Sequence, residues 1–193
     1  MIDTQDLTGQ LTGRGLILRT DFANNHWLAG LRQLRPETGV NKRMAIDSWW
    51  IDEPKLLGSN NPTTAELKQL RRQGFTVIVS LLLPGEHEPA YDLEQARELG
   101  FACHSIPVKD LTAPSLEQLS EFLEIVGNLG ADDKLLVHCQ AGIGRTGTFA
   151  AAYWISRGLS VPEAVAKIRK LRWGAIETSL QEAVLGEFAV GLE

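Results

Sequence analysis

This chain of 193 residues has few cysteines and histidines and no surplus of basic residues. Two cysteines are too few for a disulfide framework or a four-cysteine zinc site, and together with the four scattered histidines they form no ligand cluster, so we expect no bound metal. Lysine and arginine number 19 against 24 acidic residues, which gives a net charge of −5. Nucleic-acid and anionic-membrane binders need a basic face, so both classes are disfavoured.

Long apolar runs and a secretion signal are missing too. No stretch approaches the roughly 20 apolar residues that a bilayer-spanning helix needs. The first six residues include two acids where a signal peptide would carry Lys or Arg. We therefore expect a cytoplasmic protein with no membrane span.

Composition is otherwise that of one globular domain, with 44% hydrophobic and 22% charged residues. Residues 1–47 hold short apolar pieces without sustained periodicity, and we expect them to form an N-terminal extension packed on a domain of residues 48–193. The sequence does not determine the oligomeric state, although a monomer is favoured.

Strand and helix signals alternate from residue 48 onward. Apolar and β-branched runs predict strands at residues 49–51, 55–57, 75–83, 101–106 and 134–138. Capping boxes and glycine stops predict helices at residues 64–73, 93–99, 116–129 and 145–157, and two more beginning near residues 161 and 179. Alternation of this kind predicts an α/β domain with a largely parallel central sheet flanked by helices.

The most informative segment is VHCQAGIGRTG at residues 137–147, between a predicted buried strand and a predicted helix start. Unpaired backbone N–H groups and the helix dipole make such a junction suitable for a phosphate. Gly142 and Gly144 let the backbone curl around the anion, and Arg145 supplies a planar fork of donors. The same positive field favours the thiolate form of a cysteine, which makes Cys139 a candidate nucleophile.

Three other interpretations compete for this segment. A cysteine at a strand end is often only a small apolar side chain, but the Gly-x-Gly-Arg-Thr run that follows argues against it. Residues 142–147 match the dinucleotide fingerprint, yet the acid about 20 residues on is Glu163 in a helix cap, and no further strand follows. A Walker A loop would need lysine where Arg145 stands. We therefore expect no nucleotide cofactor.

The arrangement His138-Cys139, five residues, then Arg145-Thr146 resembles the signature of the cysteine-dependent protein tyrosine phosphatases, in particular their compact, atypical dual-specificity branch. The resemblance covers roughly residues 48–188 and includes segments 50–56, 107–110, 114–115 and 175–178. It implies a dual-specificity phosphatase-like fold and a phosphocysteine intermediate. The expected phosphate-binding residues are Gln140, Ala141, Gly142, Ile143, Gly144 and Arg145.

A general acid is needed to protonate the leaving oxygen, and one carboxyl can later activate water. Asp110 is our candidate because it follows a predicted strand, in a loop that can reach the neighbouring strand's carboxyl end, and because the family places its acid there. A solvated loop aspartate is the alternative. Asp92 is the second candidate acid, but it is better explained as a helix cap.

Three residues near the candidate nucleophile have both a functional and a structural interpretation. Thr146 could donate a hydrogen bond to the Cys139 sulfur or simply serve the first helical turn. Gln181 resembles the family's water-orienting glutamine and also completes a capping box. His138 could influence the reactivity of the Cys139 thiolate without contacting the substrate, or it could make only a structural hydrogen bond. Elsewhere, we expect Cys103 to be a buried inert thiol, with a minor possibility of a redox role, and Trp49, Trp50 and Trp173 to pack in the core or at its rim.

The sequence thus predicts a phosphatase acting on phosphotyrosine in a protein or peptide, with phosphoserine and phosphothreonine as further candidate substrates. An inositol phospholipid or other non-protein phosphomonoester is the alternative substrate. Residues 140–143 carry no lysine, which lipid-acting relatives usually have in this loop, so a protein substrate is favoured. A catalytically dead phosphate-binding module is the third hypothesis, weakened by the presence of Cys139, Arg145 and an acid.

Overall fold

The fold is built on one five-stranded mixed sheet with strand order β1-β2-β5-β3-β4. The computed structural model describes residues 46–192, so nearly all of the expected N-terminal extension lies outside the described residues. The first two strands pair antiparallel, and every other neighbouring pair is parallel. The strands are β1 (Ser48–Asp52), β2 (Leu56–Ser59), β3 (Phe75–Ser80), β4 (Ala102–Ser105) and β5 (Lys134–His138).

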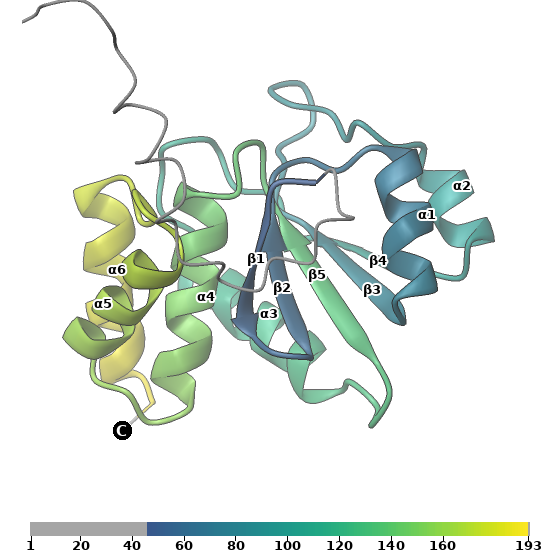
Figure 1. Cartoon of the computed structure of the whole chain (residues 1–193). Coiled ribbons are helices and arrows are strands. Elements are labelled where there is room, and N and C mark those ends of the chain that lie inside the picture. Colours follow the sequence, from purple (N-terminus) through teal and green to yellow (C-terminus); the bar gives the residue numbers. More distant parts are fainter. Residues whose placement is uncertain (1–45, 193) are drawn as a thin grey trace, which may run out of the picture. The chain divides into compact units, whose positions relative to one another are not determined.

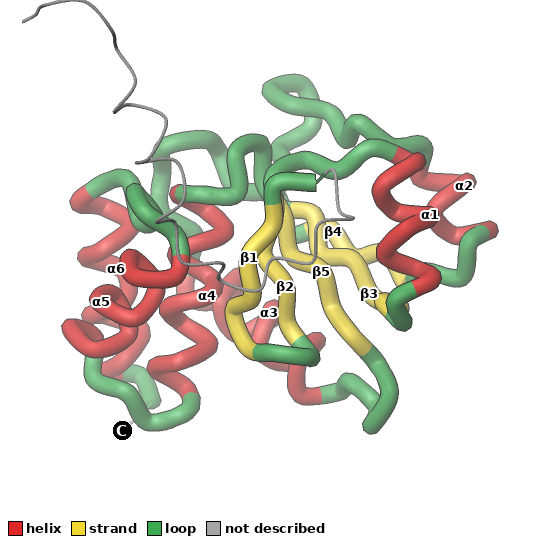
Figure 2. Tube along the Cα trace, viewed as in Figure 1, coloured by secondary structure: helices red, strands yellow, loops and turns green. Residues whose placement is uncertain are grey.

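Within the described residues, six helices cover the two faces of this sheet (Figures 1 and 2). They are α1 (Thr64–Arg72), α2 (Leu93–Glu98), α3 (Leu116–Gly127), α4 (Gly144–Ser156), α5 (Val161–Leu171) and α6 (Ser179–Val190). Side chains alternate between the faces: Leu56 and Leu135 join the core formed with α3 to α6, whereas Leu57 and Leu136 join the core formed with α1 and α2. The predicted α/β class with a largely parallel sheet is therefore confirmed. Within residues 46–192, no helix is both long and apolar enough to cross a membrane.

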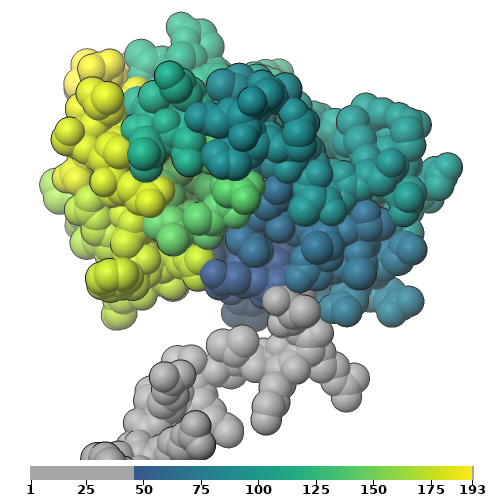
Figure 3. Space-filling view, turned by 90° about the horizontal axis from the view of Figure 1, so that it is seen from above, coloured from purple at the N-terminus to yellow at the C-terminus, as the bar shows by residue number. Residues whose placement is uncertain are grey.

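The four parallel strands end level with one another, which determines where the site can form. Ser59 and Ser80 both pair with His138, and Ser80 pairs with Ser105. The loops that leave these strand ends therefore gather at one edge of the sheet, where ligand sites of parallel sheets lie. In the view onto this end of the molecule, the green segment around residue 140 lies between teal and yellow-green segments (Figure 3).

Strand β3 is shorter than predicted. We expected a strand over residues 75–83, but it ends at Ser80. Its partners β5 and β4 end at the same level, so a longer β3 would have no ladder to join. Leu81 is nevertheless buried, and its N–H donates to the His138 carbonyl at 2.9 Å. The apolar pattern therefore extends beyond the strand because the first residues of the loop also belong to the core.

Cys103 lies on the edge strand β4, where most side chains are exposed. Its thiol is free and half-buried, so the expectation of a fully buried cysteine was wrong. Burial is still sufficient to raise the pKa of this thiol, with a smaller opposing effect from Arg97. A raised pKa disfavours the reactive thiolate.

Candidate active site

Cys139 directly follows the central strand β5 and leads into the loop that precedes α4. Its side chain is only 3% exposed. The Gly142 N–H donates a hydrogen bond to its sulfur at 3.3 Å. We call residues 139–145 the Cys loop. The loop thus curls back toward its first residue, with a backbone donor directed at the candidate nucleophile.

Groups outside the Cys loop bind three successive carbonyls within it. The Gln140 carbonyl accepts from the Asn61 N–H, the Ala141 carbonyl from Arg172 Nη2, and the Gly142 carbonyl from Trp49 Nε1, each at 3.1 Å. In a trans peptide the N–H points away from the C=O. Carbonyls that point outward therefore place the intervening N–H groups on the inner side, which is the arrangement of an anion-binding nest.

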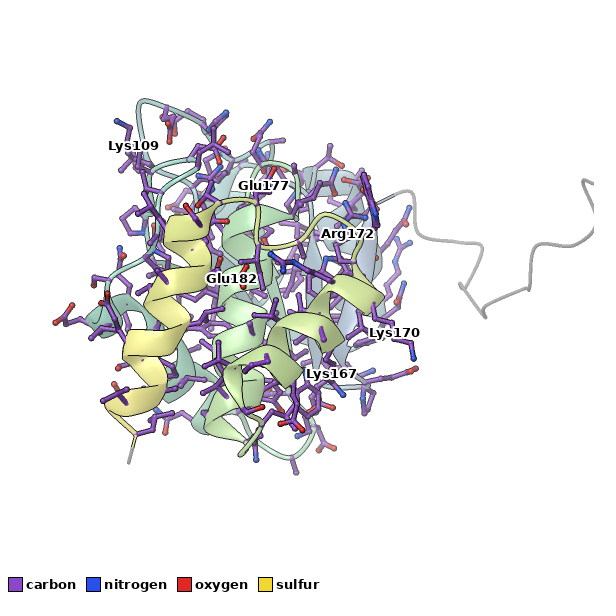
Figure 4. The ribbon with its side chains drawn as sticks, turned by 90° about the vertical axis from the view of Figure 1, so that its left-hand side faces the viewer. Lys109, Lys167, Lys170, Arg172, Glu177 and Glu182 are labelled. Atoms are coloured by element: carbon purple, nitrogen blue, oxygen red, sulfur yellow. The ribbon has the colours of Figure 1, made fainter. Side chains whose placement is uncertain are left out.

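Gly142 and Gly144 of this loop both lie close to neighbouring groups. Gly142 has φ +69°, and a Cβ there would lie 2.5 Å from the Ser59 carbonyl carbon at the end of β2. A Cβ on Gly144 would overlap the Glu177 carboxylate, which lies beside the first turn of α4 (Figure 4). The loop can therefore keep its curvature and its contact with the neighbouring backbone only with glycine at position 142, whereas a side chain at position 144 would require the flexible Glu177 side chain to move.

Arg145 is a buried guanidinium that binds the acid loop, which we define as residues 106–115. Only 1% of its side chain is exposed. Nη1 donates to the Val108 carbonyl at 3.0 Å, and Nη2 lies 2.8 Å from Asp110 Oδ1. The Asp110 N–H in turn donates to Glu86 Oε2 at 2.9 Å. The structure thus brings the two predicted residues, 35 positions apart in the sequence, into one ion pair.

The start of α4 leaves polar groups available for an anion. Ile143 is the N-cap and makes no side-chain capping bond, so the first N–H groups of α4 have no side-chain acceptor. The Nε of Arg145 is buried and has no hydrogen-bond partner within residues 46–192. A buried guanidinium nitrogen without an acceptor is costly. A bound oxyanion would supply acceptors to both groups.

Thr146 and Gln181 are both fully buried near this loop, with different hydrogen bonding. The Thr146 hydroxyl makes no hydrogen bond with the Cys139 sulfur or with any other group that the structure describes, so its functional role stays a prediction. Gln181 Oε1 accepts from the N–H groups of Glu177 and Thr178, and its Nε2 donates to the Thr112 carbonyl. All of these Gln181 contacts are structural, so in this conformation its amide caps α6 and ties it to the acid loop.

Asp92 is the N-cap of α2. Its Oδ1 accepts from the Gln95 N–H at 2.8 Å, and helix capping therefore accounts for this carboxylate, as the sequence favoured.

His138 is completely buried beneath Cys139. Its Nε2 shares a hydrogen bond with the Tyr91 hydroxyl at 3.1 Å, and the two rings meet edge to face. Burial is the main cause that lowers the pKa of His138 to about 4; the Cys139 backbone opposes this shift, and the charge of Arg145 adds to it. Burial also raises the pKa of Tyr91 to about 12. The pair is therefore uncharged at neutral pH.

We expect this buried histidine to make the protein acid-sensitive. The unfolded chain binds a proton near pH 6.5, whereas folded His138 does so only near pH 4, so stability falls as the pH decreases between these values. The full loss is about 3 kcal/mol at pH 4. His138→Gln, which keeps a partner for Tyr91, should lose that much less stability than the parent between pH 7.5 and 4 in urea unfolding. Equal losses in both proteins would contradict the assignment.

The sequence interpretation missed the residues that hold the Cys loop from outside. Trp49 was expected only to pack in the core or at its rim; it is buried, and it also donates to Gly142. Arg172 follows α5 and binds Asp47 through two contacts of 2.7 and 2.6 Å. That pairing lowers the pKa of Asp47 and raises that of Arg172. Trp173, in contrast, is 91% exposed, so the prediction that it packs in the core or at its rim was wrong.

No group of three or more His, Cys, Asp or Glu side chains within residues 46–192 is arranged to hold a metal ion. The groups that the site brings together are a thiol, a guanidinium, a carboxyl and backbone N–H groups.

Comparison with known proteins agrees with this fold. The family model described as "Polymorphic toxin system, DSP-PTPase phosphatase" matches residues 54–159. The crystal structure of Tk-PTP in the active form is 36% identical in sequence, with a TM-score of 0.67 over 75% of this chain and 97% of that chain. The chain belongs to the DSP-PTPase phosphatases, within the cysteine-based protein tyrosine phosphatase superfamily.

Other relatives differ from this chain in length, and the structure of one of them is described with a bound ligand. Protein tyrosine phosphatase domain-containing protein 1 from Danio rerio is 28% identical over 80% of this chain, which spans only 24% of that relative. Protein tyrosine phosphatase type IVA 3 from Bos taurus is 29% identical over 64% of this chain and 73% of its own length. The structure of PTPMT1 in complex with PI(5)P has 21% identity and a TM-score of 0.68, covering 75% of this chain and 96% of that one. That last likeness shows the shared fold.

Proposed function

We propose that this chain hydrolyses phosphomonoesters through a phosphocysteine intermediate, with phosphotyrosine in a protein or peptide as its main substrate. Phosphoserine and phosphothreonine are further substrates of the same chemistry. The observation that carries the proposal is the convergence of Cys139, Arg145 and Asp110 at one end of the sheet: Gly142 donates to the Cys139 sulfur, and Arg145 pairs with Asp110 at 2.8 Å.

Each residue then has a defined part in the reaction. The Cys139 thiolate attacks phosphorus, while Arg145 and the inward N–H groups of the Cys loop bind the phosphoryl oxygens. Asp110 gives a proton to the leaving oxygen and, in the second step, takes one from the water that breaks the S–P bond. Thr146 donates to the departing sulfur, and Gln181 orients the water.

Charge around the Cys loop supports a singly phosphorylated side chain as substrate. Residues 140–143 are uncharged. Arg172, the cation that contacts this loop from outside, is already paired with Asp47 through both of its terminal nitrogens. A polyphosphorylated head group would need unpaired cations for its additional phosphates.

A side-by-side substrate panel tests the proposal with the full chain. We expect hydrolysis of a nitrophenyl phosphate and of phosphotyrosine peptides, competitive inhibition by vanadate and no inhibition by chelators. Phosphoserine and phosphothreonine peptides, soluble inositol phosphates and vesicles containing a phosphoinositide complete the panel. Faster turnover of an inositol phosphate or a phosphoinositide would replace the protein substrate by the lipid-type alternative. Binding of vanadate without any turnover would indicate a phosphate-binding module instead.

A further inference from the structure

The outward carbonyls of the Cys loop show which side chains determine its shape. Gln140 and Ala141 are exposed, so little packing holds this part of the loop. Gly142, which follows, adds backbone freedom rather than restraint. The conformation that points N–H groups inward therefore depends on the donors that bind the carbonyls from outside. Two of these donors are side chains, and each fixes a different peptide group.

Arg172 holds the peptide that contacts the nucleophile. Its Nη2 donates to the Ala141 carbonyl at 3.1 Å, and the N–H at the other end of that same peptide, Gly142 N–H, donates to Cys139 Sγ at 3.3 Å. Hydrogen bonds at the two ends of one peptide strengthen each other. Asp47 anchors the guanidinium with both carboxylate oxygens, and only 19% of the Arg172 side chain is exposed. Figure 4 shows Arg172 at the loop end of α5, beyond Lys167 and Lys170.

Trp49 holds the next peptide. Its Nε1 donates to the Gly142 carbonyl at 3.1 Å in a buried contact, and the N–H at the other end of this peptide belongs to Ile143. The indole reaches across β2 because its partner in the strand register is Gly58, where a Cβ would lie 2.9 Å from the ring. Gly58 and Trp49 together therefore connect the edge strand β1 to the Cys loop.

We propose that Arg172 and Trp49 are positioning residues of the Cys loop, Arg172 setting the N–H that stabilises the Cys139 thiolate and Trp49 setting an N–H that binds a phosphoryl oxygen. The inference rests on the proposed function, because it assumes a reactive thiolate and an oxyanion in the loop. It adds two residues, from β1 and from the end of α5, that touch neither substrate nor sulfur.

The Arg172 role is tested by alkylation of Cys139 with iodoacetamide as a function of pH, in a Cys103→Ser background so that one thiol reacts. Arg172→Gln should move the midpoint of the profile upward by about one pH unit, because the sulfur loses a polarised donor and a nearby cation. Lys170→Gln is the matched control, since it removes one positive charge from the same helix end without a contact to the loop, and it should leave the midpoint in place. Equal shifts in both variants would overturn positioning in favour of general charge.

Asp47→Asn provides a second variant if Arg172→Gln does not fold. It leaves the guanidinium in place but weakens its anchor, so a smaller shift in the same direction is expected. No shift in a folded Asp47→Asn protein, together with an unfolded Arg172→Gln, would overturn the role of Arg172.

The Trp49 role is tested by vanadate binding in titration calorimetry. Trp49→Phe keeps an aromatic ring and removes one donor, so we expect affinity to fall roughly tenfold while the alkylation midpoint stays unchanged. Trp154→Phe is the matched control, because Trp154 Nε1 also donates to a backbone carbonyl, that of Ile51 at 3.2 Å, remote from the Cys loop. Parent-like vanadate affinity in Trp49→Phe would overturn its role. If the parent protein itself binds no vanadate, the proposed function fails. If the parent binds vanadate and the Arg172 and Trp49 variants behave like the parent, only the positioning roles fail.

Discussion

Replacing Cys139 with serine should lower turnover by roughly 10⁴-fold or more while leaving the fold and oxyanion binding intact. A hydroxyl in this buried position is close in size to the thiol and can still accept from Gly142, so the Cys loop keeps its shape. It is, however, a far weaker nucleophile and no thiolate can form. Steady-state hydrolysis of a nitrophenyl phosphate and vanadate binding measure the two effects separately.

Cys103→Ser is the matched control for this experiment. Cys103 is the other free cysteine, and it lies half-buried on the edge strand β4. Its replacement should leave the rate within a factor of about two. Substantial turnover by Cys139→Ser, or loss of turnover on changing Cys103 alone, would contradict a phosphocysteine mechanism at Cys139.

Asp110→Asn should reduce the rate on phosphotyrosine by roughly 10²–10⁴-fold, the usual contribution of general acid catalysis. The loss should be much smaller for an aryl ester with a good leaving group, because that oxygen departs without a proton. The ion pair adds a further expectation. Asparagine no longer competes for Arg145, so KM should not rise although kcat falls. Rates on a series of aryl phosphates of graded leaving-group basicity measure both parameters.

Asp92→Asn is the control for the acid. Asparagine caps a helix as well as aspartate does, so α2 should remain intact and the rate unchanged. A loss that depends on the leaving group in Asp92→Asn, with none in Asp110→Asn, would exchange the two assignments. If neither variant shows a loss that depends on the leaving group, the general acid lies on a segment that contains neither Asp110 nor Asp92.

Features encoded within a few consecutive residues could be predicted from the sequence. The capping boxes of α1 and α6, Thr63 with Glu66 and Thr178 with Gln181, are present as expected, because both partners lie in one helical turn. The Cys loop was predicted for the same reason, since glycines, arginine and cysteine needed for an oxyanion site stand within seven residues. The Asp110 placement needed one more inference, that loops after parallel strands meet at one edge, and the structure shows that they do.

Long-range hydrogen bonds could not be predicted in this way. Trp49 and Gly142 are 93 residues apart, and Arg172 reaches Ala141 from beyond α5. Neither side chain belongs to a local motif, and a tryptophan in an apolar strand is ordinarily explained by packing alone. The end of β3 was misplaced for a related reason. The apolar run to Leu83 indicated burial, whereas the strand ends where its neighbours end.

The ion pair between Arg145 and Asp110 makes substrate capture an anion exchange. In the unliganded protein the guanidinium is already paired with the carboxylate at 2.8 Å, so an arriving phosphate that binds both Nε and Nη2 displaces Asp110 from it. The displaced carboxyl then lies next to the phosphate instead of next to the cation. Under the proposed mechanism, the exchange thus places the general acid beside the leaving group that it serves. Small monoanions such as chloride would bind weakly by the same logic, because they compete with a tethered carboxylate and bring only one charge.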